Sequence, residues 1–526
     1  MATYYWVGGS AQWFVSGNTH FATSSGGTAG TATPTAADNV IVDNNSGSPT
    51  ITVGNGVVCK TLTSTATTCV FGGLGAMAVS GNVTFSSGTT FTGGVLTINA
   101  TSTITVPNSL GCGVTFNSIG GTLTLASNLT TTSLFTLTNG TLNLANFTLT
   151  VGTFNSNVSN IRVIQFGTGN ITTTNSGTMF FVSGSNLTYT GTPTVNISNN
   201  SATGSTITTS TGFTATNALN FNITTGTYAL SVTSASVFKS LDFTGFTGSW
   251  APGGTSETFY GSLTLVSGMT FTTGTATFSF LNTSGTAVIT PAGKTLYSIT
   301  QNGSGGTVQL AGALTTSLTY NLTQGTLDLN SFVLNTNAFN SSNTATRVIA
   351  FGSNGKITIT GSGSTAFQMS TSTNYSYTGT GTISFTSTSP ATFSGGGSSY
   401  PTLNLNGTGA VTVTGANTFA NITNTTTGVR SLVLPASTTT TVNAFSLKGV
   451  LGSLVTITSS TALTQATMNL TTGKVTNSDY LVIQDSSVTP STGTWYAGAN
   501  SVNTSNNTGW IFANYVPSTG NFFLIF

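Results

Sequence analysis

The sequence predicts an all-β fold: an elongated, repeat-built parallel β-helix or β-solenoid with distinct capping elements at its two ends. Three observations predict it. Residues that favour pleated strands are abundant, whereas charged residues, including the helix formers Glu, Lys and Arg, make up 3% of the 526 residues. Apolar residues recur with a period of two. Long segments are also repeated at a fixed spacing, which is the signature of stacked repeats.

The composition excludes disorder and several classes of partner. The chain is 37% hydrophobic and contains 33 Phe, whereas disordered chains are poor in such residues. Nine basic and seven acidic side chains give a formal net charge of +2 and are spread along the chain, so no basic patch for nucleic acid is predicted. A neutral polar surface favours self-association, and we expect a homo-oligomer, most simply a homotrimer.

Residues 1–55 are predicted to form an N-terminal cap or attachment element. They carry neither the basic nor the apolar segment of a secretory signal, and no stretch of the chain reaches the roughly 20 apolar residues of a membrane span. We therefore expect synthesis in the cytoplasm and no membrane insertion. Trp6 and Trp13 are expected to close the open end of the core. Asp38 and Asp43 could help hold a cation, but two carboxylates are too few to predict a metal site.

Residues 56–235 and 236–425 are predicted to be two copies of one β-solenoid module. The matching segments, each displaced by 185 positions, are 121–126 with 306–311, 140–144 with 325–329, and 162–167 with 347–352. Upstream, residues 81–85 match 261–265 at a displacement of 180, so a five-residue insertion separates the two registers. A fixed spacing of this kind indicates repeated structural units.

Short strands with one apolar face fill each module. Between residues 140 and 151 one face is predicted to carry Leu142, Leu144, Phe147, Leu149 and Val151, and the second copy repeats the pattern with Leu327, Leu329, Phe332 and Leu334. The other face carries Thr141, Asn143, Thr148 and Thr150. Because side chains alternate along a strand, such strands must stack to hide their apolar faces from water.

Two architectures satisfy this pattern, a solenoid of stacked coils and a string of tandem β-sandwich domains. The strands are broken after two or three inward residues, which is shorter than the usual sandwich strand of about 5–6 residues. Asn-Gly and Asp-Gly hairpin signals between them are scarce. Both observations favour the solenoid.

Residues 426–526 are predicted to form a short third module and a C-terminal cap or tip. The module begins at 430–432, which match the earlier markers 60–62 and 239–241. Trp495, Tyr496 and Trp510 then form an aromatic cluster. They are candidate contacts for a glycan or a partner, because aromatic rings stack on sugars. The alternative is that they close the end of the core.

No catalytic or cofactor-binding residue is predicted. A polysaccharide-cleaving enzyme would need two carboxylates across a sugar bond, and Asp242 with Glu257 is the best candidate pair, although its spacing matches no known motif. The single histidine, His20, supports no Ser–His–Asp set. The three cysteines, Cys59, Cys69 and Cys112, lack metal-ligand spacing and are expected to be buried.

Both ends of the chain carry a resemblance. Trp6–Ser10, Trp13, Pro34 and residues 38–42 resemble the opening of many phage structural proteins and of autotransporter β-helix passengers. The stretch from Asp479 through Trp495–Ser501 to 507–512 looks like the terminal element of uncharacterised Thr/Gly/Asn-rich β-solenoid virion proteins of tailed phages.

The resemblance implies a non-enzymatic virion protein, a fibre or surface appendage for host-surface adhesion or particle decoration. Other virion proteins and a host-surface glycan are then its expected partners, and the virion is its expected location. Two alternatives remain open, a tailspike polysaccharide depolymerase and a bacterial surface adhesin.

Overall fold

A computed structural model shows an all-β protein and confirms the predicted fold class. Its described residues, 1–14, 20–30, 32–199, 203–210, 212–232, 235–252, 254 and 256–517, form a parallel β-solenoid of about 22 turns. The one helical element among them is a single 3-10 turn, η1 (Asn44–Ser46). The described strand pairs are parallel except that β1 (Thr3–Trp6) pairs antiparallel with β3 (Phe21–Ala22), which rules out tandem antiparallel sandwiches.

The chain divides into two compact units, Met1–Ala276 and Thr277–Phe526. The division at residues 55, 235 and 425 was drawn from repeated sequence segments, whereas these two units are defined by compactness. The sequence division therefore stays a prediction. In unit 1, β22 (Asn220–Thr225) pairs with β25 (Ser240–Asp242) across residue 235. In unit 2, β43 (Val411–Thr414) pairs with β45 (Arg430–Leu434) across residue 425. Within each unit, coils therefore continue through the repeat limits.

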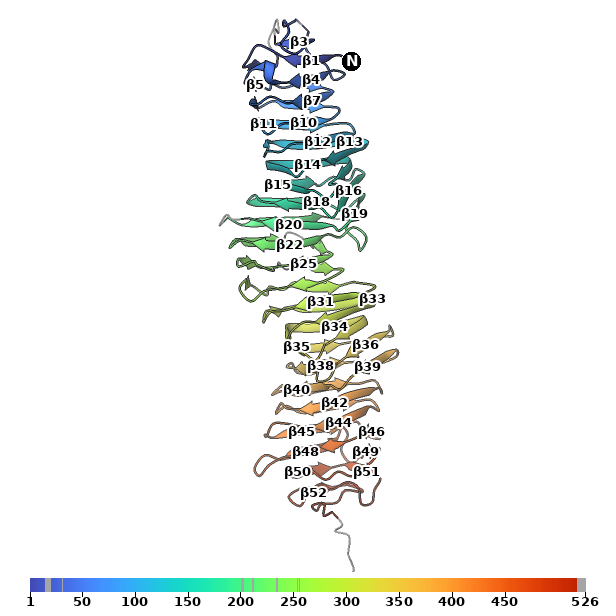
Figure 1. Cartoon of the computed structure of the whole chain (residues 1–526). Coiled ribbons are helices and arrows are strands. Elements are labelled where there is room, and N and C mark those ends of the chain that lie inside the picture. The colour runs from blue at the N-terminus through green and yellow to red at the C-terminus, as the bar shows by residue number, and fades with distance from the viewer. Residues whose placement is uncertain are drawn as a thin grey trace, which may run out of the picture. The chain divides into compact units, whose positions relative to one another are not determined.

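Stacked parallel coils build the core of unit 1. Strands β13 (Gly111–Leu125), β14 (Leu129–Asn143) and β16 (Arg162–Gly167) lie side by side in successive coils (Figure 1). Their register places Leu123 beside Leu142 and Leu142 beside Ile164, and each of the three is at most 1% exposed. The alternation of apolar and polar residues thus becomes a continuous apolar column along the inside of the coils.

Unit 2 repeats this arrangement with the second copy of the sequence. Strands β33 (Ser298–Leu310), β34 (Leu314–Asp328) and β36 (Arg347–Ala350) pair in the same order. Val308 lies beside Leu327 and Leu327 beside Ile349, all fully buried. The displacement of 185 positions therefore carries over to the backbone pairing.

One part of the predicted inward face is wrong. Phe147 is half-buried and Phe332 is 37% exposed, whereas the other predicted inward residues are buried. The cause is a turn that precedes each phenylalanine, in which Ala145 and Asn146, like Asn330 and Ser331 in the second copy, have positive φ angles. Such a turn interrupts the period of two, so the next side chain no longer faces the core.

Aromatic rings stack from coil to coil inside both units. Phe154 lies between Phe135 and Phe180, with ring centroids 5.8 and 5.5 Å away and interplanar angles of 6° and 14°. In unit 2, Phe339 lies in the same way between Tyr320 and Phe367, at 6.0 and 5.4 Å. Parallel strands place like residues at the same point of each coil, which produces these stacks.

Replacing Phe154 with alanine should lower the free energy of unfolding by about 3 kcal/mol, because the change leaves a cavity and removes two ring contacts. Hydrogen exchange of peptides that cover β14 and β15 (Thr148–Ser156) measures the effect locally. Phe339→Ala is the matched variant and should produce a similar loss in unit 2. Unchanged exchange in both variants would contradict the stacked core.

Aromatic residues also close the core at the N-terminal end. Trp6 and Trp13 are fully buried, and the His20 ring stacks on Trp6 at 5.2 Å with an interplanar angle of 12°. Phe21 meets both tryptophans edge-on, each at 5.2 Å. The rings cover the first coil where its apolar interior would otherwise meet water.

Three arginines occupy buried positions at the start of strands. Arg162, Arg347 and Arg430 are at most 2% exposed. Arg162 donates to the carbonyl oxygens of Asn160, Ser156 and Ser185, so one guanidinium ties together turns of two coils. Burial lowers the pKa of all three arginines, while hydrogen bonds from the side chain to backbone carbonyls compensate part of the desolvation.

Candidate binding groove

The aromatic residues predicted as glycan contacts lie mainly inside unit 2. Trp495 is fully buried and donates its indole N–H to the Thr489 carbonyl over 3.0 Å. Trp510 is 9% exposed, packs edge-on against Trp495 at 5.2 Å, and donates to the Ser486 hydroxyl over 3.1 Å. Neither tryptophan therefore offers a free ring face to a sugar.

Tyr496 is the more accessible of the three predicted contacts. It is half-buried and meets Tyr515 edge-on, with ring centroids 5.2 Å apart. The Lys474 ammonium group lies 5.2 Å from the centre of the Tyr515 ring. These contacts hold the tyrosine pair against its own unit.

The two carboxylates considered for glycan cleavage lie on different sides of the coil wall. Asp242 is half-buried at the end of β25 and accepts hydrogen bonds from the N–H and hydroxyl of Thr244, at 2.8 and 2.6 Å. Glu257 begins β27 (Glu257–Phe259) and is fully buried, on the same inward face as Phe259. The structure thus does not bring these two groups together across a cleft, as glycoside hydrolysis requires.

Glu257 is an unusual core residue. Among the described residues, neither of its carboxyl oxygens has a well-formed hydrogen bond. Burial raises the pKa of Glu257 to about 8, and the backbone of Ser236 opposes part of this rise. A buried carboxyl with so little hydrogen bonding is favoured in its neutral form, because ionisation inside the coil carries a large desolvation cost.

The two carboxylates of the N-terminal cap, Asp38 and Asp43, accept hydrogen bonds from nearby backbone N–H groups. Asp38 accepts from the N–H of Ala2 at 2.7 Å and from the Thr35 hydroxyl at 2.7 Å. The hydrogen bond from the Thr35 hydroxyl, followed by that from Ala2, lowers the pKa of Asp38 to about 2. Asp43 caps η1 by accepting from the N–H of Asn45 at 3.0 Å.

The described residues contain no group of three or more His, Cys, Asp or Glu side chains that could hold a metal ion. Cys59, Cys69 and Cys112 are all buried free thiols, as expected from the sequence. Burial raises the pKa of each thiol, to about 11 for Cys69. Raised thiol pKa values make these cysteines poor nucleophiles.

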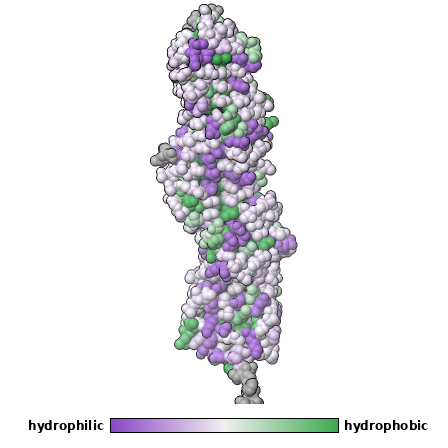
Figure 2. Space-filling model, in the orientation of Figure 1, coloured by the Kyte–Doolittle hydropathy of each residue, from purple (hydrophilic) through white to green (hydrophobic). Residues whose placement is uncertain are grey.

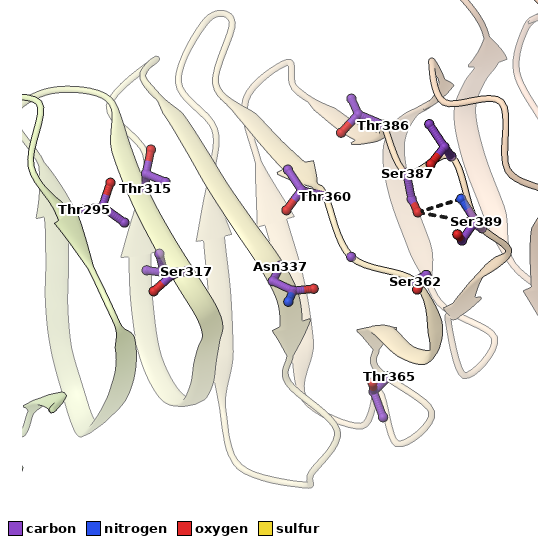
Figure 3. A pocket seen from close by; sticks show the side chains of 13 residues that line it. Thr295, Thr315, Ser317, Asn337, Thr360, Ser362, Thr365, Thr386, Ser387 and Ser389 are labelled. Atoms are coloured by element: carbon purple, nitrogen blue, oxygen red, sulfur yellow. Dashed lines mark hydrogen bonds between the residues drawn. The ribbon is translucent and has the colours of Figure 1, made fainter. Parts of the chain in front are cut away.

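A hollow of about 850 Å³ lies on the surface of unit 2. Hydroxyl and amide side chains line it, together with one glycine, and no lining residue is charged or aromatic (Figure 3). The lining consists of Thr295, Thr315, Thr316, Ser317, Asn337, Thr360, Gly361, Ser362, Thr365, Thr386, Ser387, Thr388 and Ser389. We call this hollow the hydroxyl groove.

Successive coils contribute to the hydroxyl groove in turn. Thr295 of β32 (Thr295–Leu296) is the register partner of Thr315 in β34, and Asn337 lies on β35 (Val333–Asn340). The next coils supply residues 360–362 after β37 (Lys356–Ile359) and 386–389 after β40 (Thr382–Phe385). In Figure 3 the side chains follow one another across the strands.

The hollow forms where the coils turn a corner. The register between β34 and β35 shifts between Thr316 and Thr319, so their regular pairing is interrupted there. Gly361 follows on the next coil, and a Cβ at this position would lie 1.7 Å from the Asn337 side-chain oxygen. A glycine is therefore required for the Asn337 carboxamide to lie across the coil.

Most lining hydroxyls that form a hydrogen bond donate their proton to a backbone carbonyl of the coils, and so away from the hollow. Thr360 donates to the Thr336 carbonyl at 3.3 Å, and Thr386 donates to the Ile359 carbonyl at 3.2 Å. Ser387 donates to the Ser389 carbonyl at 3.0 Å and accepts from its N–H at 3.1 Å (Figure 3). A hydroxyl used in this way keeps a lone pair as an acceptor for another molecule.

A second hollow of about 340 Å³ adjoins the hydroxyl groove and shares Asn337 and Thr365 with it. Amides dominate its lining, which also includes Asn321, Asn340 and Gln368. Leu318, 41% exposed, supplies an apolar patch. The two hollows together offer hydrogen-bond donors, acceptors and a small apolar surface.

Two other hollows occupy duplicated positions, one on each unit. The first, of about 600 Å³, is lined by Ile119 and Ile161, which are 92% and 75% exposed. In its counterpart of about 490 Å³, the positions 185 residues later are Ser304 and Thr346. The backbone thus forms the same hollow with apolar or with polar side chains, so the exposed isoleucines are not required by the fold.

The sequence contains a signal for some of these features but not for the hydroxyl groove. The inward position of Glu257 could have been predicted, because it shares the parity of Phe259 in the alternating run Glu257–Phe259. The duplicated Arg162 and Arg347 also fall on inward positions of their strands. Thr, Ser and Asn are so common throughout the chain that nothing distinguishes the groove residues before the coils are assembled.

No helix within the described part of the chain combines the length and the apolar character that crossing a membrane requires. No protein-family model matches the sequence, and comparisons with curated proteins and with solved structures gave no match.

Proposed function

We propose that this protein is a structural component of a tailed-phage virion, a fibre or surface appendage that serves host-surface adhesion or particle decoration. The observation that carries the proposal is the separation of apolar and polar side chains within each coil. Apolar side chains fill the interior, and outward positions carry mainly Thr, Ser and Asn, so that the visible surface is largely near-neutral in hydropathy (Figure 2). Such a protein is suited to presenting a surface.

The ends of the chain support the same proposal. The segments that resemble phage structural proteins are those that close the core, with Trp6 and Trp13 at one end and Trp495 and Trp510 at the other. Self-association into a homotrimer and contact with other virion proteins belong to the proposal. A low net charge reduces repulsion between copies, and exposed apolar residues such as Ile119 supply surface for contact.

A role as a glycan-cleaving tailspike is less well supported. Its best carboxylate pair is divided between the outer surface, for Asp242, and the core, for Glu257. An adhesion role needs no such pair.

Mass spectrometry of purified phage particles tests the proposal. The protein should remain with infectious particles through a density gradient and be present in a fixed number of copies per particle. Antibody labelling of the same particles should mark an external appendage. Recovery of the protein solely from the envelope of uninfected bacteria would overturn the proposal in favour of a bacterial adhesin.

A further inference from the structure

The lining of the hydroxyl groove selects a neutral polar ligand. Anionic polymers such as nucleic acids are held by Lys and Arg, and hard cations are held by several carboxylates, yet no lining residue is charged. Apolar small molecules favour hydrophobic and aromatic walls, which are also missing from the lining. A ligand rich in neutral hydroxyl groups matches the remaining chemistry.

The spacing of the lining residues favours a polymer. Coils of a parallel sheet are about 4.8 Å apart, so a ligand that crosses the coils meets a new set of polar side chains at each step of that length. Thr315, Asn337, Thr360 and Ser387 represent successive steps. In an extended sugar chain, the rise per pyranose ring is close to the distance between neighbouring coils. A polysaccharide can therefore repeat its contacts in register with the protein.

The hydrogen-bond directions also suit a sugar chain. The hydroxyls of Thr360, Thr386 and Ser387 are oriented by the carbonyls to which they donate, so their lone pairs are fixed as acceptors. Sugar hydroxyls are abundant donors, and the exposed Asn337 carboxamide offers both a donor and an acceptor. Groups that are already oriented lose less conformational entropy when a ligand binds.

An extended peptide fits the hydroxyl groove less well. Peptides that add to a sheet need an unpaired strand edge. Strand β35 is paired with β34 on one side and with β37 on the other, so its backbone groups are used. A polypeptide strand also repeats at about 3.3 Å per residue, which does not match the distance between coils.

We propose that the hydroxyl groove and the adjoining amide-lined hollow bind a neutral polysaccharide chain that lies across the coils of unit 2. This inference deepens the adhesion role proposed above by naming the class of receptor and by placing its site on the side of unit 2, away from the terminal aromatic residues. Each sugar makes few contacts, so the affinity should increase with chain length and with the number of copies presented together.

Affinity electrophoresis of the full chain tests this inference. Native gels would contain dextran, mannan or galactan, and a fourth gel would contain dextran sulfate as a charged counterpart of dextran. At least one neutral polysaccharide should retard the protein, with weaker retardation by short oligosaccharides of the same kind. Retardation by none of the three, or by dextran sulfate alone, would overturn the inference.

Variants locate the binding. Asn337→Leu keeps the branching at Cγ while removing the polar atoms and should weaken binding at least tenfold, while Thr315→Val should weaken it about threefold. The matched control is Thr130→Val, which changes the equivalent threonine of the first copy, outside the hydroxyl groove. It should leave binding unchanged. Equal retardation of wild type and Asn337→Leu would contradict the site.

Two further measurements separate the possible causes of failure. Circular dichroism and thermal unfolding establish that each variant is folded, which is expected because Asn337 is exposed and Thr315 faces outward. The binding assay uses purified protein, so its result does not depend on where the protein is located. Loss of the virion assignment would leave the glycan site standing, and absence of glycan binding would leave the virion assignment standing.

Discussion

Replacing Leu142 with aspartate should lower the free energy of unfolding by about 5 kcal/mol, because it places an unpaired charge inside the core. Leu142 is fully buried between Leu123 and Ile164 of the neighbouring coils. Because each coil contacts its neighbours along the solenoid, the loss should be concentrated near the substitution. Hydrogen exchange should therefore accelerate most in peptides from β13, β14 and β16.

Two matched variants control this experiment. Thr141→Ser changes the adjacent outward residue and should alter stability by no more than about 0.5 kcal/mol. Leu327→Asp changes the equivalent residue of the second copy and should reproduce the loss in unit 2. A large loss from Thr141→Ser would show that the outward face is itself packed, for example against another copy. An unchanged Leu142→Asp protein would contradict the register.

The Glu257→Gln variant should remove a pH dependence of stability that amounts to about 5 kcal/mol in the wild type. The folded-state pKa of Glu257 is raised to about 8, above its ordinary value of 4.5. At pH values between 4.5 and 8, the Glu257 carboxyl carries a proton in the folded state but has largely lost it in the unfolded state. The stabilising contribution is therefore complete below about pH 4.5 and is lost as the pH rises through 8.

Calorimetry at pH 5, 7 and 9 measures this effect. The unfolding temperature of the wild type should fall across the series, and that of Glu257→Gln should change much less. Asp38→Asn is the control, because the pKa of Asp38 is lowered to about 2 and its contribution is lost only as the pH falls from about 4 toward 2. A wild-type slope that persists in Glu257→Gln would show that another group causes it and would contradict the raised pKa of Glu257.

The predictability of the fold differs from that of the groove for a physical reason. Burial of alternating residues such as Leu142 and Leu144 follows from the period of two, and the duplication shows that the same packing occurs again at Leu327 and Leu329. Phe147 departs from the pattern because two residues with positive φ intervene. Asn146 belongs to a residue type that favours this conformation, but Asn is common along the chain and Ala145 gives no signal of it.

The candidate site depends on how coils are placed beside one another. Trp495 and Trp510 are conspicuous in the sequence, yet both are buried in the core, where their large apolar rings are removed from water. The hydroxyl groove is made of common residues that come together only when the coils stack, as Thr295 does with Thr315. Composition and motifs carry no trace of that alignment.

An experimental density map at side-chain resolution tests most directly the claim that the duplicated apolar faces are buried by stacking parallel coils. The map should place Leu123, Leu142 and Ile164 in one inward column, with strands about 4.8 Å apart, and Val308, Leu327 and Ile349 in an equivalent column. Antiparallel hairpins at either set of residues, or different backbones for the two copies, would contradict the account.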